Sequence, residues 1–148
     1  MPTTGQKGAI AESAIVHAAT KLGILFARPL TAAERYDLVF DLGARFLRVQ
    51  CKWAVRHGAV VIIRCYSSRR ARTGLVHRSY SENEIDAIAA YCLDTGRCYF
   101  LPASWIGGRR SVQLRLAPTR NNQGAGVVWA DAFEFESLDW DGLIVPGP

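Results

Sequence analysis

Residues 35–52, RYDLVFDLGARFLRVQCK, decide the fold of this 148-residue chain. The stretch predicts two strands, 36–41 and 45–52, joined by a turn at Leu42-Gly43-Ala44. Side chains of a strand alternate between its faces, so the second strand has an apolar face of Leu47, Val49 and Cys51 and a polar face of Arg48, Gln50 and Lys52. The hairpin therefore brings Asp37, Gln50 and Lys52 to one edge of the predicted sheet.

These three residue types suit a divalent metal next to a phosphodiester. A hard cation takes oxygen ligands, here the Asp37 carboxylate, the Gln50 side-chain carbonyl and the main-chain carbonyl of Cys51. Lys52 then orients an attacking water or neutralises the charge that develops on a phosphate. A D…QxK pattern by itself is equally typical of an exposed hairpin face with solvated polar residues.

An amphipathic helix is predicted over residues 7–22, before the hairpin. Its stripe is formed by Ile10, Ala14, Ala18 and Leu22, and Gly23 ends it. If the helix packs on the hairpin, Glu12 supplies a second carboxylate to the metal site. The alternative is an ordinary solvated glutamate.

The remaining segments predict one α/β domain over residues 1–135. Strands are expected at 24–29, 59–66 and 111–116, a hairpin from 86–92 and 97–101, and loops at 53–58, 67–79 and 118–123. An apolar fraction of 49% with 21% charged residues indicates a globular chain with a real core. Residues 136–148 form an acidic tail containing proline and glycine, which we expect to fray.

Charge is unevenly distributed along the chain. Residues 1–130 carry all 18 basic residues and 8 acidic ones, whereas 131–148 carry five acidic residues and no basic one. A basic body rich in arginine favours nucleic acid as the partner, because guanidinium groups fork to phosphates and guanine edges. An anionic membrane surface or a non-specific polyanion would also fit this charge.

Candidate DNA contacts lie in polar segments outside the hairpin. The basic ones are Arg69, Arg70, Arg72, His77 and Arg78 of loop 67–79, and Arg109 and Arg110 of a glycine-rich corner. Asn121, Asn122 and Gln123 could bond base edges, although asparagines there also suit a turn. For the basic loop, simple solvation is the alternative.

The chain shows no charged-then-apolar leader and no apolar run of the roughly 18 residues that span a bilayer. We therefore expect a cytoplasmic protein without membrane contact. The four cysteines form no CxxC pair, so reduced, buried thiols are expected.

The ordered motifs carry a family resemblance. Glu12 in the helix, RYD with Asp37, and VQCK with Gln50 and Lys52 resemble the PD-(D/E)XK nuclease superfamily. The flanking segments resemble more closely the small endonucleases of that superfamily found in bacterial group I introns: KGAIAE, RYDLVFD, FLRVQCK, IDAIAAYC, YFLP, LAPTRNNQ and VVWA. The likeness covers residues 7–129.

The resemblance implies a central mixed β-sheet flanked by helices and a site-specific, Mg²⁺-dependent (or Mn²⁺-dependent) endonuclease that cuts double-stranded DNA as a homodimer or homotetramer. Asp37 would be the central metal ligand, Glu12 the helical carboxylate, Gln50 the residue at the acidic position and Lys52 the catalytic lysine. A metal-activated water would attack the scissile phosphate in line.

Two positions depart from the superfamily pattern. Tyr36 replaces the proline before the aspartate, where the residue supplies shape and no charge. Gln50 replaces an acid, which removes one negative charge and lowers the expected metal affinity; the intron-encoded relatives also carry glutamine there. The alternatives are a DNA-binding protein of this fold without chemistry, and a restriction, repair or junction-resolving nuclease.

Overall fold

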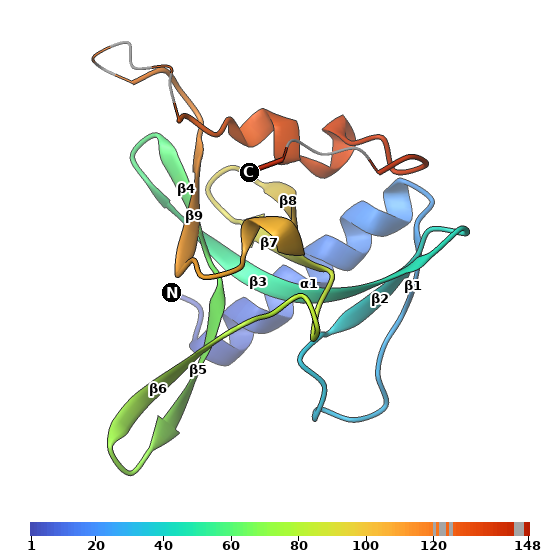
Figure 1. Ribbon diagram of the computed structural model, residues 1–148, viewed down its shortest axis with the longest axis vertical. Helices are drawn as coiled ribbons and strands as arrows, with labels where there is room; N and C mark the ends of the chain where they lie inside the picture. Colours follow the sequence, from blue (N-terminus) through green and yellow to red (C-terminus); the bar gives the residue numbers. More distant parts are fainter. Residues whose placement is uncertain (120, 122–123, 125, 144–146) are drawn as a thin grey trace.

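The computed structural model describes residues 1–119, 121, 124, 126–143 and 147–148. Within these ranges one long helix packs on a mixed sheet, and a separate hairpin projects from it (Figure 1). The elements are α1 Thr4–Lys21, β1 Leu25–Ala27, β2 Leu38–Asp41, β3 Phe46–His57, β4 Val60–Arg64, β5 Tyr66–Ala71, β6 Gly74–Ser79, β7 Ala87–Cys92, β8 Arg97–Pro102, β9 Ser111–Arg115 and the 3-10 helices η1 Ala103–Trp105, η2 Ala130–Phe133 and η3 Phe135–Ser137.

The long strand β3 organises the main sheet. Its first part pairs with β2 in the antiparallel sense, its middle with β7 in parallel, and its last part with β4 in the antiparallel sense. Strands β1, β8 and β9 extend the sheet through β2, β7 and β4. The mixed sheet with a flanking helix confirms the predicted fold class.

The helix α1 begins earlier than predicted because Thr3 caps it. The Gln6 amide donates to the Thr3 hydroxyl over 3.2 Å, and the Thr3 amide donates to the Gln6 side chain over 2.8 Å. This capping box satisfies two amides that would otherwise lack a partner at the first turn.

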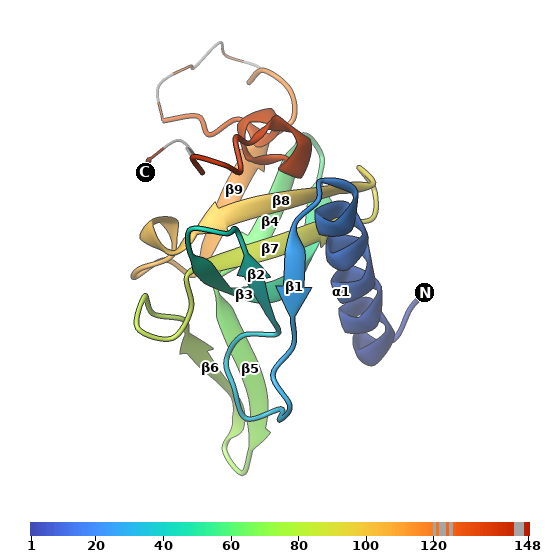
Figure 2. The same cartoon turned by 90° about the vertical axis from the view of Figure 1, so that its right-hand side faces the viewer.

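The predicted apolar stripe of α1 is wrong by one position. The buried residues are Ala11, Ile15 and Ala19, while Ile10 and Leu22 are 37% and 39% exposed. The helix covers one face of the sheet, as the turned view shows (Figure 2). Glu12, next to the buried Ala11, is therefore carried to the margin of the packed face.

Two apolar clusters fill the two faces of the sheet. One joins α1 to Leu47 and Val49 of β3 and to Phe135, and the other joins the opposite face of β3 and β7 to Trp105 and Phe133. The alternation predicted for residues 45–52 is confirmed, since Leu47 and Val49 are buried on one face. Three of the four cysteines are buried as well.

Three predictions of local structure are wrong. Residues 53–57 form no loop, because β3 continues to His57 and pairs with β4. Residues 67–79 form the hairpin of β5 and β6, turning before Gly74, whose φ of 113° suits glycine. In the C-terminal segment, Leu138, Trp140 and Leu143 pack against the core, so this part does not fray.

The second predicted hairpin and the strand at 111–116 are confirmed as β7–β8 and β9, and the short helix η1 lies between β8 and β9 in the sequence. In both views the β1–β2 connection and the β5–β6 hairpin project from the same end of the sheet (Figures 1 and 2). No helix in the described ranges is long and apolar enough to span a membrane.

Candidate active site

Asp37 lies immediately before β2, where the pairing of β2 with β3 ends. Its amide donates to the Val49 carbonyl, and its carboxylate accepts the Cys51 amide, both over 2.9 Å. The Asp37 carboxylate thus accepts the amide of β3 that lies just beyond the end of its pairing with β2. The pKa of Asp37 is raised above its ordinary value, mainly because the carboxyl is buried. The hydrogen bond from Cys51 lowers the pKa, and the negative charge of Glu12 adds to the increase.

The main-chain carbonyl of Cys51 faces the same side. In an extended strand the N–H and C=O of one residue point to the same edge, and the Cys51 N–H already points at Asp37. The Gln50 side-chain amide donates to this carbonyl over 3.4 Å, a long and weak bond. Three oxygen-bearing groups of β2 and β3 therefore lie together.

Glu12 approaches the same place from α1. It forms an ion pair with Arg28, at 2.5 Å between Nη1 and Oε1, and both residues line a cleft of about 300 Å³ together with Tyr36 and Asp37. The rest of the wall comes from the β1–β2 connection. The structure thus brings Glu12 to the start of the hairpin, as predicted.

Lys52 is held by the base of the projecting hairpin. Its ammonium donates to the carbonyl of Tyr66 over 2.7 Å and lies 5.0 Å from the ring centre of Tyr80. Burial lowers the pKa of Lys52, whereas the Asp37 carboxylate raises it. The lysine and Asp37 are thus in electrostatic reach of each other.

The donor chemistry suits a hard divalent cation. Two carboxylates, Glu12 and Asp37, lie near the Cys51 carbonyl and the Gln50 side-chain amide, whose nitrogen faces that carbonyl, and oxygen donors of this kind are the ligands that Mg²⁺ and Mn²⁺ prefer. Among the described residues no three His, Cys, Asp or Glu side chains gather as a metal cluster. Because Gln50 is neutral, Glu12 and Asp37 are the two acidic residues of the candidate site.

Asp86, the other acid near the sheet edge, has a structural role. It accepts hydrogen bonds from the main-chain amide and the guanidinium of Arg48, at 2.7 and 3.1 Å. Burial opposes ionisation of Asp86, but the Arg48 contacts outweigh it and lower its pKa. Arg48 shares a strand face with Gln50 and Lys52, but its guanidinium is paired with Asp86.

The predicted DNA contacts are divided between faces of the hairpin and a neighbouring corner. The pairing register puts Arg70 and His77 on one face and Arg69 and Arg78 on the other. Arg72 lies in the turn, and Arg109 and Arg110 stack on Trp105 and Tyr66 at 5.6 and 5.3 Å. Asn121 is exposed, while Asn122 and Gln123 lie outside the described residues.

The sequence interpretation missed three residues beside the site. Arg28 pairs with Glu12, and Arg35 donates a hydrogen bond to the β5–β6 hairpin. The ring of Tyr80 contacts both Arg35 and Lys52. Only Arg35 left a local signal, since it stands two residues before Asp37 in the RYD motif. The other two come from distant segments.

Two comparisons with known proteins found similar sequences or structures. The family model described as PD-(D/E)XK endonuclease matches residues 2–136. A solved structure titled as a bacterial homing endonuclease, I-Ssp6803I, is 25% identical with a TM-score of 0.71, covering 90% of this chain and 89% of that one. No curated protein matches. Because the family model spans nearly the whole chain, the protein belongs to the PD-(D/E)XK endonuclease family.

Proposed function

We propose that this protein is a Mg²⁺-dependent or Mn²⁺-dependent, site-specific endonuclease that hydrolyses double-stranded DNA as a homing-type enzyme. The observation that carries the proposal is the convergence of Glu12 of α1, Asp37 just before β2 and Lys52 of β3 on the edge of β3. Family membership and the homing endonuclease among its structural neighbours support it.

Each site residue has a role in this proposal. Asp37, Glu12, the Gln50 amide oxygen and the Cys51 carbonyl hold the ion, which when bound activates water and polarises the phosphate. The Lys52 ammonium neutralises charge that develops on the phosphoryl oxygens. Arg28 pairs with one carboxylate oxygen of Glu12, which leaves the other oxygen for the ion.

The exposed arginines of the hairpin and of the corner after η1 are proposed to hold DNA. Arg110 and His77 both contact the Tyr66 ring at the hairpin base, and Arg70 lies on the same face of the hairpin nearer its turn, so the three form one basic surface. Tyr66 also binds Lys52 through its carbonyl. A DNA backbone bound at the base of this surface would therefore lie next to the candidate catalytic lysine.

The Arg70→Gln variant should weaken DNA binding and lower its salt dependence. Each neutralised phosphate contributes about −0.9 to the slope of log K against log salt, so the slope should become less steep by about that amount. Fluorescence anisotropy in EDTA over a range of salt measures this. Arg97→Gln, which removes an exposed arginine paired with Glu134, should leave the slope unchanged, and an unchanged slope in Arg70→Gln would count against the contact.

The neutral Gln50 supports a second candidate, a DNA-binding protein that keeps the fold and lacks chemistry. The Gln50→Glu variant separates the two. In a nuclease the added carboxylate restores a charged ligand, and half-maximal cleavage should need several-fold less Mg²⁺. Titration of cleavage with Mg²⁺ measures it. If neither wild type nor Gln50→Glu cleaves DNA although both bind it, the binding protein would be favoured.

We propose a homodimer or homotetramer, because one chain of this size covers little DNA. Leu25 and Phe46 form an exposed apolar surface that a second copy of the chain would cover. They flank Asp41 in one cross-strand row of β1, β2 and β3 and are 68% and 69% exposed. Light scattering should give a multiple of the 16.3 kDa chain, reduced by a Leu25→Glu, Phe46→Glu double variant. A wild-type monomer at micromolar concentration would refute the assembly.

A further inference from the structure

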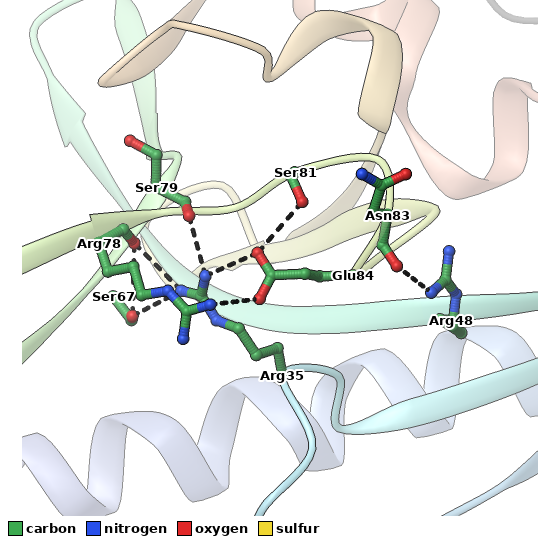
Figure 3. A network of polar contacts seen from close by, with 8 residues as sticks. All are labelled: Arg35, Arg48, Ser67, Arg78, Ser79, Ser81, Asn83 and Glu84. Atoms are coloured by element: carbon green, nitrogen blue, oxygen red, sulfur yellow. Dashed lines mark hydrogen bonds and ion pairs between the residues drawn. The ribbon is translucent and has the colours of Figure 1, made fainter.

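Arg35 joins the loop before Asp37 to both strands of the projecting hairpin. Its guanidinium donates to the Ser67 hydroxyl of β5 over 2.7 Å and to the carbonyls of Arg78 and Ser79 of β6 over 3.1 and 2.8 Å (Figure 3). The side chain is only 15% exposed. A charged group so enclosed needs these partners, and here all of them except one belong to the hairpin.

The remaining partner is Glu84, in the turn before β7. Its carboxylate accepts from Arg35 over 3.0 Å and from Arg78 over 2.9 Å, and the Ser81 hydroxyl donates to it over 3.2 Å (Figure 3). Desolvation opposes ionisation, but the two arginines outweigh it and lower the pKa of Glu84. The hairpin, the Asp37 loop and the turn before β7 thus meet at one ionic cluster.

This cluster lies where the hairpin needs support. Strands β5 and β6 form a sheet of their own and share no ladder with the main sheet in the described residues. A two-stranded hairpin is marginally stable alone, so contacts at its base set its direction. Both Nη1 and Nη2 of Arg35 donate two hydrogen bonds there.

The same base holds the candidate catalytic lysine. Lys52 donates to the carbonyl of Tyr66, the first residue of β5, and Arg35 and Lys52 lie 4.2 and 5.0 Å from the centre of the Tyr80 ring, which directly follows β6. A shift of the hairpin base therefore displaces the partner of the Lys52 ammonium. Through Arg35, only two residues from Asp37, it also displaces the start of β2.

Two simpler roles for Arg35 fit less well. An ion pair at the surface contributes little stability and holds nothing in place, but Arg35 is largely enclosed and bonds three segments. A direct phosphate contact requires free donors at the surface. The Nη groups of Arg35 are already engaged within the protein.

We propose that Arg35, with Glu84, is a positioning residue that fixes the β5–β6 hairpin against the active site, so that DNA held by the hairpin is aligned with Lys52 and Asp37. The inference rests on the proposed nuclease function. It assigns Arg35 to the alignment of bound DNA, separate from the affinity for DNA and from the chemistry itself. Misalignment by about 1 Å can cost 10²-fold in rate.

The test compares Arg35→Met, Arg35→Lys and Glu84→Gln with wild type. We measure the single-turnover cleavage rate at saturating DNA with Mg²⁺, and the Kd for the same DNA in EDTA. Arg35→Met should lose about 10- to 100-fold in rate while Kd changes less than about threefold. Lysine cannot reproduce the fork of donors, so Arg35→Lys should recover only part of the rate.

Arg97→Met is the matched control, because Arg97 also pairs with a carboxylate, that of Glu134 at 3.1 Å, away from the hairpin. It should cleave at the wild-type rate. Hydrogen exchange adds a readout without cleavage: amides of residues 66–79 should exchange faster in Arg35→Met while those of β7 and β8 do not. If Arg35→Met fails to fold, Glu84→Gln, which keeps the bonds of Arg35 to Ser67, Arg78 and Ser79, should still lose several-fold in rate.

A folded Arg35→Met that cleaves at the wild-type rate, or whose whole defect is in Kd, overturns the positioning role and leaves the nuclease proposal intact. A wild-type protein that cleaves no DNA with Mg²⁺ or Mn²⁺ overturns the proposed function and this inference with it. The two failures are thereby distinguished.

Discussion

The Asp37→Asn variant is expected to lose about 10³-fold or more in cleavage rate at saturating DNA. The carboxylate is fixed by the Cys51 amide at the centre of the oxygen donors, and asparagine keeps its size while removing its charge. A bound ion supplies several kcal/mol of transition-state stabilisation, and each 1.36 kcal/mol is a factor of ten. Single-turnover cleavage with Mg²⁺ measures the loss.

Metal binding gives this prediction a readout apart from activity. Calorimetric titration with Mn²⁺ should show a clearly weaker site in Asp37→Asn than in wild type. Asp139→Asn is the matched control in the C-terminal segment, where the carboxylate accepts the Gly142 amide, and it should match wild type in both assays. An Asp37→Asn protein that retains a tenth of the wild-type rate would contradict the assignment.

The Phe135→Ala variant is expected to cost about 3–5 kcal/mol of unfolding free energy. Phe135 is fully buried, and its ring meets Phe40, Phe100 and Trp140 edge to face with centroids 6.3, 6.3 and 5.2 Å away. The truncation leaves a cavity under the C-terminal segment and removes three aromatic contacts.

Urea unfolding followed by tryptophan fluorescence measures this loss, and Leu93→Ala is its control. Leu93 is 51% exposed just after β7, so its removal should change the unfolding free energy by no more than about 0.5 kcal/mol. A loss below about 1.5 kcal/mol in Phe135→Ala would mean that the C-terminal segment contributes little to the core.

The hairpin of residues 35–52 could be predicted because its information is local. Alternation puts Leu47 and Val49 on one face whatever the rest of the chain does, and both side chains are buried in the structure. The face of α1 could not be assigned in the same way. Alanine and isoleucine occupy both candidate stripes, so packing against the sheet chose Ile15 over Ile10.

The candidate catalytic residues were predicted from their order in the sequence, and the structure brings Glu12, Asp37 and Lys52 together. Their supporting contacts were beyond sequence reasoning, because Arg28 with Glu12 and Arg35 with Glu84 join segments far apart in the chain. The same limit explains the loop predicted at 67–79. Its polar residues lack strong strand propensity, and the hairpin depends on contacts at its base.

The central claim is that this chain cuts DNA at a specific sequence with Mg²⁺ held at Asp37 and with Lys52 at the reacting phosphate. End-sequencing of a complex DNA library incubated with the protein tests it most directly, beside an EDTA control and a Lys52→Ala variant. We predict recurrent ends at one sequence with wild type and Mg²⁺ and none in either control. Tight DNA binding without recurrent ends would contradict the claim and favour a binding protein or a nuclease for branched DNA.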